Sequence, residues 1–163
     1  MLINKKDHKG FTIIEVMIVL AIAGLIMLIV FLAVPALQRN SRNTALRNDV
    51  ASVLGGVSEF ITNNNGSLPT TITTSGTDVT IHSTVAGTSD VTAKVKDGTA
   101  VSNGTAMPTC PAGGTCQTGT IVVYLNRKCT NNAFSATATP RAVAAGYLVE
   151  GANGNTTNQC TES

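Results

Sequence analysis

One carboxylate stands in a chemically unusual place near the start of the chain. Glu15 is the only charged residue of a long apolar run, Ile13–Val34. Burying a carboxylate costs about 2.5–3.5 kcal/mol at the centre of a bilayer and less near its surface, so such residues are usually functional. In a low dielectric, a carboxylate and an ammonium group attract strongly, and each offsets the desolvation of the other. Glu15 is therefore predicted to have a function; the alternative is an interfacial residue near the lipid headgroups.

The cysteines form the second group of reactive side chains. All four lie in the C-terminal third of the chain, at Cys110, Cys116, Cys129 and Cys160. An even number behind an apolar segment indicates two disulfides in an oxidising compartment. A zinc site is the alternative, but there is no Cys-x-x-Cys pair, and His8 and His82 are poorly placed as further ligands. Three pairings are possible, of which Cys110–Cys116 with Cys129–Cys160 is favoured.

No catalytic constellation is evident in the rest of the chain. Only one histidine, His82, lies beyond the first ten residues, and the acidic residues are scattered. That leaves no nucleophile with a base beside it and no paired carboxylates. His82 alternates with an apolar neighbour and is expected to face solvent. We therefore predict neither an enzyme nor a bound metal or cofactor.

Charge and composition are distributed unevenly. The first ten residues carry the whole net charge of +2, and the remaining basic and acidic residues balance. A neutral body argues against general nucleic-acid binding, which requires a basic surplus on one face. The candidates for a small basic patch are sparse: Lys94, Lys96, Arg127, Lys128 and Arg141.

The length and the flanking residues of the apolar run predict a membrane-spanning helix. Its 22 residues, 13–34, are enough to cross a bilayer as a helix. The basic leader before it predicts that the N-terminus stays in the cytoplasm and the body is exported. A conventional signal peptide would have a shorter apolar core and a cleavage site after it. A plain signal anchor would leave Glu15 unexplained.

The residues from Lys9 to Ile22, KGFTIIEVMIVLAI, closely resemble the processing motif of type IV pilins. The resemblance implies that prepilin peptidase, a membrane protease, cuts between Gly10 and Phe11 and then methylates the amine of Phe11. It also implies that Glu15 pairs with the Phe11 amine of a neighbouring subunit during assembly. Gly24 matches the mid-run glycine of the family. The family's proline usually lies within the apolar run, whereas here Pro35 follows it, so the helix is expected to bend near Gly24 and Pro35.

Beyond Pro35 the pattern becomes amphipathic. Apolar residues recur at three- and four-residue spacing, at Leu46, Val50, Val53, Leu54, Val57 and Phe60 or Ile61. This stripe predicts that one helix continues from about Thr12 to Asn63 and packs on the head. The arginines on its other face, Arg39, Arg42 and Arg47, have two readings. They are solvated and reach the lipid headgroups, or they pair with Asp49 or Glu59 of neighbouring subunits.

The residues after Gly66 predict short strands separated by turns. Alternation or apolar runs mark 77–85, 91–95, 121–125 and 142–149 as strands. The predicted fold is α+β and pilin-like: a long N-terminal helix on a small antiparallel sheet. The predicted divisions are a cleaved leader 1–10, a transmembrane and assembly helix 11–37, an amphipathic continuation 38–63, and a β head 64–163 with two disulfides.

The expected function is that of a structural subunit. Its partners would be the prepilin peptidase, the inner-membrane assembly machinery, membrane lipid before assembly, and identical subunits in an extracellular type IV pilus for adhesion, twitching motility or DNA uptake. The alternatives are a type II secretion pseudopilin, a minor pilin acting as adhesin or DNA receptor, and a membrane-anchored exported protein. The acid-poor tail 150–158 lacks the oxygen ligands of the calcium site that major pseudopilins often carry. The five basic residues named above are too sparse for a DNA receptor.

Overall fold

The computed structural model describes residues 10–110 and 116–163. The chain forms two compact units, divided between Gln38 and Arg39. Helix α1, Ile13–Asn63, contributes to both units, and its hydrogen-bonded turns run through Gly24 and Pro35. This agrees with the predicted helix to within one residue at its start.

The second half of α1 packs on the head through the predicted stripe. Leu46, Val50, Val53, Leu54, Val57 and Phe60 are all buried. They join apolar residues of every strand from β1 to β6 in one core, and Ile61 packs at its margin. Full burial of side chains of this size contributes about 1.5–3 kcal/mol each, so this stripe anchors α1 to the head.

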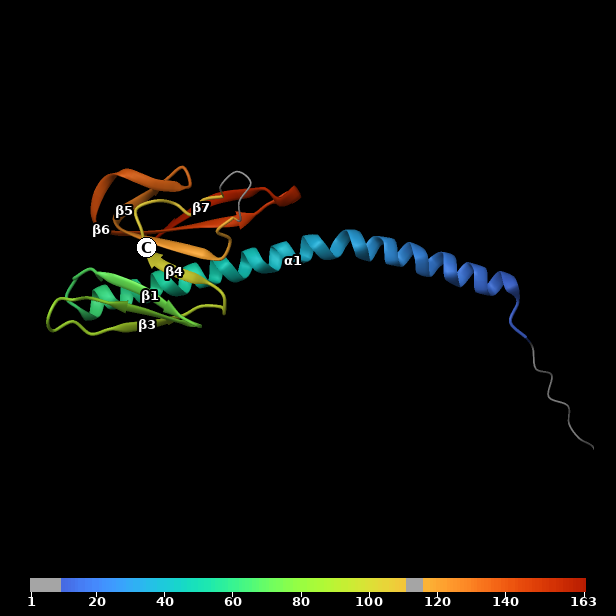
Figure 1. Cartoon of the computed structure of the whole chain (residues 1–163), viewed down its shortest axis with the longest axis horizontal. Coiled ribbons are helices and arrows are strands. Elements are labelled where there is room, and N and C mark those ends of the chain that lie inside the picture. The colour runs from blue at the N-terminus through green and yellow to red at the C-terminus, as the bar shows by residue number, and fades with distance from the viewer. Residues whose placement is uncertain (1–9, 111–115) are drawn as a thin grey trace, which may run out of the picture. The chain divides into compact units, whose positions relative to one another are not determined.

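The head contains two sheets (Figure 1). The first is antiparallel, in the order β1 (Thr71–Ser75), β2 (Asp78–His82) and β3 (Val91–Lys94). The second has the order β4 (Ala100–Asn103), β5 (Thr120–Thr130), β6 (Ala133–Glu150) and β7 (Thr156–Glu162). A short 3-10 turn, η1 (Ala152–Gly154), precedes β7. The predicted α+β class is confirmed, but the predicted single antiparallel sheet is wrong in detail, since β4 pairs with β5 in parallel.

The two sheets meet where β1 lies beside β4. The hydroxyl of Thr74 donates to the carbonyl of Val101 at 3.0 Å and accepts from its N–H at 2.7 Å. The Thr74 side chain therefore bonds the backbone N–H and C=O of Val101 in place of a neighbouring strand. As a result, neither backbone group is buried without a hydrogen-bond partner.

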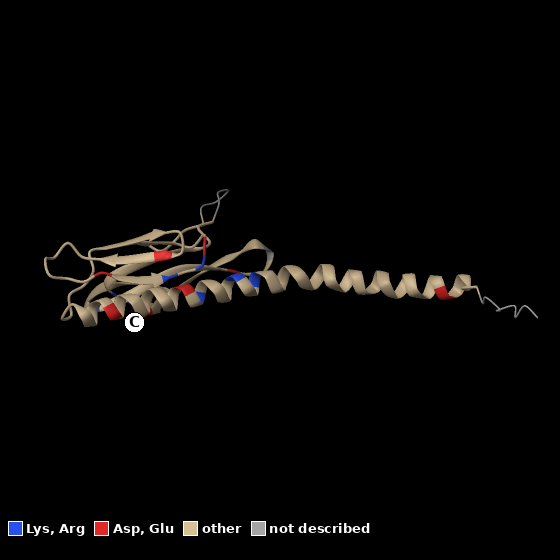
Figure 2. Cartoon of the chain, turned by 90° about the horizontal axis from the view of Figure 1, so that it is seen from below, with Lys and Arg blue, Asp and Glu red and all other residues tan. Residues whose placement is uncertain are grey.

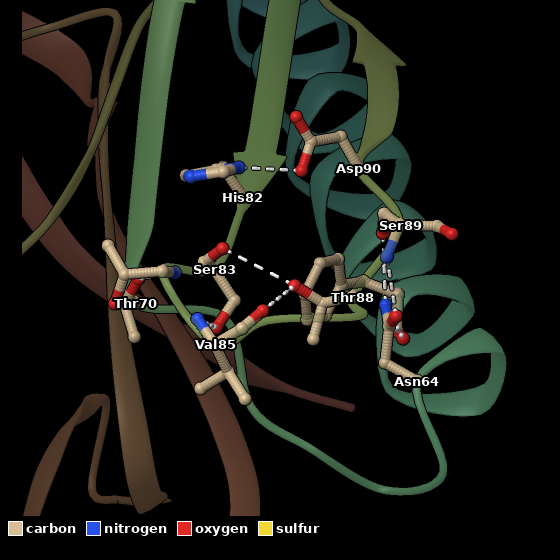
Figure 3. Close-up of polar contacts among 10 residues, drawn as sticks. Asn64, Thr70, His82, Ser83, Val85, Thr88, Ser89 and Asp90 are labelled. Atoms are coloured by element: carbon tan, nitrogen blue, oxygen red, sulfur yellow. Dashed lines mark hydrogen bonds and ion pairs between the residues drawn. The ribbon is translucent and has the colours of Figure 1, made fainter.

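The loop between β2 and β3 is tied to the end of α1 (Figure 3). The buried Asn64 side chain donates to the carbonyl of Ser89 at 3.0 Å and accepts from the N–H of Ser89 at 2.7 Å. Within the loop, the hydroxyl of Thr88 donates to the carbonyl of Val85 at 2.7 Å. Side chains here form the hydrogen bonds to the backbone of Val85 and Ser89 that a neighbouring strand would otherwise form. Strand β2 therefore ends at His82, whereas the predicted strand extended to residue 85.

Strand β6 is much longer than the predicted 142–149. Asn131 and Asn132 both adopt positive φ, 50° and 59°, and join β5 to β6 in a two-residue turn. Such turns match the twist of a hairpin and require positive φ at both positions, a conformation that asparagine adopts more readily than most residues. Asn126 and Arg141 also have positive φ, where the register of β5 and β6 shifts. The bulge lets one hairpin extend beyond the core.

Candidate functional site: the processing and assembly segment

The predicted cleavage point lies in an exposed stretch before α1. Gly10 is exposed, the Phe11 side chain is 88% exposed, and the helix begins only at Ile13. A Cβ placed on Gly10 would meet nothing within 4 Å. The fold itself therefore does not require glycine here, so any such requirement comes from a partner that approaches the backbone. Residues 1–9 of the predicted leader lie outside the described residues.

Glu15 closes the start of its own helix. The N–H and the hydroxyl of Thr12 each donate to the Glu15 carboxylate at 2.8 Å, and the Glu15 N–H donates to the Thr12 hydroxyl at 3.3 Å. This reciprocal arrangement is a capping box, with Thr12 as N-cap and Glu15 three residues later. This contact was not predicted, although Thr-x-x-Glu before an apolar run is the sequence signal of a capping box. Within one chain, Glu15 thus already has hydrogen-bond partners.

The first half of α1 presents its apolar side chains to the surroundings. Every large hydrophobic residue from Ile13 to Leu37 is at least 40% exposed. No Lys, Arg, Asp or Glu occurs between Glu15 and Arg39. Figure 2 shows the corresponding long tan stretch of α1. In the described part of the chain, α1 is the one helix long and apolar enough to cross a membrane. Such a surface suits insertion into a bilayer and burial among similar helices.

The helix then enters the head through a polar clasp. The Arg42 guanidinium donates to the Glu150 carboxylate at 2.5 Å from one nitrogen and at 3.0 Å from another. The Asn43 side chain pairs with the backbone of Glu150 in both directions, at 2.8 and 2.9 Å. The hydrogen bond from Arg42 lowers the pKa of Glu150, with further contributions from the charges of Arg42 and Arg39. The same contact raises the pKa of Arg42.

The prediction that Asp49 pairs with an arginine of a neighbouring subunit is wrong, because Asp49 is buried in the head. It was a candidate partner for an arginine of a neighbouring subunit, but only 8% of its surface is exposed. Its two oxygens accept from the N–H of Lys96 at 3.0 Å and from the hydroxyl of Thr99 at 2.7 Å. Asp49 therefore holds the 96–99 turn against α1 and is not available at the surface. Glu59 is exposed, and its predicted role stays a prediction.

Both predicted disulfides are present with the favoured pairing. Cys110 pairs with Cys116, their Cα atoms being 4.1 Å apart, and Cys129 pairs with Cys160 at 5.6 Å. The second bond joins β5 to β7, which are not hydrogen-bonded neighbours in the sheet. The span 111–115, inside the first disulfide loop, lies outside the described residues.

The structure distributes the five sparse basic candidates over several elements. Lys94 on β3 forms an ion pair with Asp78. Arg127 on β5 lies 5.2 Å over the Tyr124 ring and donates to the carbonyl of Ser135 at 3.1 Å. Lys96 lies in the turn after β3, Lys128 lies on β5 and Arg141 lies on β6. Lys94 and Arg127 are thus engaged within the head.

His82 is exposed, as predicted, and its Nδ1 lies 2.6 Å from a carboxylate oxygen of Asp90 (Figure 3). Within the described ranges, no group of three or more His, Cys, Asp or Glu side chains is placed to hold a metal ion.

Residues 5–31 match the family model described as the prokaryotic N-terminal methylation motif. No curated protein and no solved structure matches the chain at a significant level. The matched segment spans the Gly10–Phe11 bond, the capping box and most of the apolar run. Together with the helix-on-sheet head, it supports a type IV pilin-like prepilin, that is, a type IV pilin-family or pseudopilin-like protein. The motif points to a structural subunit that prepilin peptidase processes.

Proposed function

We propose that this protein is the precursor of a structural subunit of an extracellular type IV pilus, and not an enzyme. One observation carries the proposal: the matched methylation motif covers an exposed stretch, Gly10 and Phe11, that leads directly into a capped apolar helix. Cleavage between Gly10 and Phe11 by prepilin peptidase leaves an α-amine on Phe11, which the same enzyme methylates. The inner-membrane assembly machinery then transfers the subunit from lipid into a polymer of identical subunits.

Burial of the apolar surface of residues 11–37 among neighbouring helices drives assembly. Apolar burial is worth about 25 cal/mol per Å² from water, but transfer from lipid yields less. Helix packing and polar contacts must therefore set the register. In this account Glu15 leaves the capping box and pairs with the Phe11 amine of a neighbouring subunit, where the low dielectric strengthens the attraction.

Processing is tested with two glycine substitutions in the full chain, expressed together with a prepilin peptidase. A Cβ at Gly10 or at Gly24 would meet nothing within 4 Å, so neither position is packed against the rest of the described chain. Gly10→Val is expected to block cleavage, because the protease approaches this backbone closely. The matched Gly24→Ala is expected to be cleaved normally. Normal cleavage of Gly10→Val, or failure to cut the unchanged chain between Gly10 and Phe11, would refute this processing step.

The role of Glu15 is tested by separating its charge from its hydrogen bonds. Glu15→Gln keeps an acceptor for the Thr12 N–H, since glutamine also closes a capping box. Thr12→Val removes the hydroxyl of the box and keeps the charge. If Glu15 pairs with an amine, Glu15→Gln is cleaved and inserted but yields few filaments, whereas Thr12→Val assembles. The opposite ranking would show that capping is the whole role of Glu15.

A further inference from the structure

Residues 38–48 of α1 are rich in hydrogen-bond donors and amphoteric groups, with apolar side chains only at Ala45 and Leu46. Residues 38–48 contain three arginines and no acid, and no carboxylate occurs anywhere between Glu15 and Asp49. The arginines are accompanied by amides and hydroxyls: Gln38, Asn40, Ser41, Asn43, Thr44 and Asn48. Guanidinium groups flanked by amides and hydroxyls suit phosphate oxygens, which only accept hydrogen bonds.

Two of the three arginines form no ion pair within the described residues, although the half-buried Arg39 helps to lower the pKa of Glu150 through its charge. Arg42 is paired with Glu150. Across residues 10–110 and 116–163, no ion pair involves Arg39 or Arg47, and the Arg47 side chain is exposed. The nearest acid in sequence, Asp49, is buried and hydrogen-bonded inside the head.

The remaining acid at this surface is Asp97. It lines a cavity of about 190 Å³ together with Arg42, Asp49, Lys96 and Glu150. By formal charge, Arg42 and Lys96 offset two of the three carboxylates there, so this neighbourhood adds one negative charge. Arg39 and Arg47 exceed that charge by one, so the segment keeps a small basic surplus.

We propose that Arg39, supported by Arg47, binds the phosphate headgroups of anionic phospholipid while the subunit is in the membrane. The inference rests on the proposed membrane-inserted stage. Arg39 follows Leu37 by two residues, so the chain cannot place it more than about 7 Å from the apolar segment. The polar layer of a bilayer adds about 5–8 Å on each side of the hydrocarbon. Arg39 thus lies within the headgroup layer.

Arg47 acts at longer range. It lies eight residues beyond Arg39 on the same helix, about 12 Å along the axis at 1.5 Å per residue. That distance exceeds the Debye length of about 8 Å at physiological ionic strength, so its attraction to the surface is partly screened. Arg39 is the principal contact and Arg47 a weaker one.

The test measures lipid preference with the full chain in mixed micelles that hold equal amounts of phosphatidylglycerol and phosphatidylcholine. Native mass spectrometry counts the lipids that remain bound. A basic residue near an anionic surface is worth about 1 kcal/mol, or roughly fivefold. Arg39→Gln is expected to reduce the preference for phosphatidylglycerol about fivefold, and Arg47→Gln to reduce it less. Arg39→Lys is expected to retain most of it, and added salt to weaken it.

Lys128→Gln is the matched control, because it removes one exposed positive charge from β5. It is expected to leave the preference unchanged. The lysines of the leader contribute equally to every variant, so the comparison between variants isolates α1. Equal retention of the two lipids, or equal losses for Arg39→Gln and Lys128→Gln, would overturn the proposal.

Flotation with vesicles of phosphatidylcholine alone separates this inference from the proposed function. If the unchanged chain inserts into those vesicles but shows no preference for phosphatidylglycerol, only the lipid site is wrong. If the chain does not insert at all, the membrane stage of the proposed function fails as well.

Discussion

Two adjacent glycines on α1 provide a matched test of how the helix packs on the head. A Cβ on Gly56 would lie 2.8 Å from the Ile81 Cδ1 atom and 3.0 Å from the Ala93 Cβ atom. A Cβ on Gly55 would meet nothing within 4 Å. Replacing either glycine by alanine in a helix gains the same intrinsic propensity, about 1 kcal/mol. The difference between the two variants therefore isolates the packing term.

The magnitude follows from which neighbours can move. The Ile81 terminal methyl can rotate away, but the Ala93 Cβ is fixed to strand β3. Overpacking of this kind costs about 1–3 kcal/mol. Gly55→Ala is expected to raise the free energy of unfolding by about 1 kcal/mol, and Gly56→Ala to lower it by as much as about 2 kcal/mol.

Tyrosine fluorescence during urea unfolding measures both variants. The chain has no tryptophan, and its two tyrosines, Tyr124 and Tyr147, both lie in the head. The full chain is unfolded in mild detergent with its disulfides intact, so the signal reports the head alone. Equal stabilisation by Gly55→Ala and Gly56→Ala would show that α1 does not approach β2 and β3 closely, and would refute the packing described above.

Three further changes test the contacts that hold the head. Asp49→Ala leaves the buried Thr99 hydroxyl and the partly buried Lys96 N–H without an acceptor, and is expected to cost about 2 kcal/mol in urea unfolding; an unchanged midpoint would contradict this. Arg42 lowers the pKa of Glu150 below its ordinary value of about 4.5, so the pair stabilises the fold above that pH and the contribution is lost as pH falls through the lower, folded value. Between pH 6 and 3, the melting temperature of Glu150→Gln should therefore fall less steeply than that of the unchanged chain. Parallel curves for the two proteins would show that the Arg42–Glu150 pair does not stabilise the fold. Replacing Cys129 and Cys160 by serine opens a 31-residue loop and is expected to cost about 3–4 kcal/mol; a loss below 1 kcal/mol would contradict a structural disulfide.

Elements whose signal is local could be predicted from the sequence. The buried stripe of α1 follows from apolar spacing alone, because one helix face meets one core. The stop after Asn63 follows from a run of asparagines and a glycine, and Gly66 indeed has positive φ. The methylation motif is equally local, since its residues lie in one short stretch of the chain.

Elements that depend on distant partners could not be predicted. Strand β7 has little apolar character and exists because it pairs with β6 and is bonded through Cys160. The parallel pairing of β4 with β5 depends on the path of the chain between them. Asp49 was assigned to the helix surface because no local pattern shows that the 96–99 turn folds over it. The Arg42–Glu150 clasp likewise joins residues 108 positions apart.

The central claim is that this chain is processed at Phe11 and polymerised into a surface filament. Intact-mass spectrometry with N-terminal fragmentation, applied to filaments sheared from the native host, tests that claim directly. The account predicts a dominant species that begins at methylated Phe11 and is lighter by four hydrogens than the reduced chain, one pair for each disulfide. A chain that is absent from filaments, or that keeps its leader in the membrane, would contradict the account.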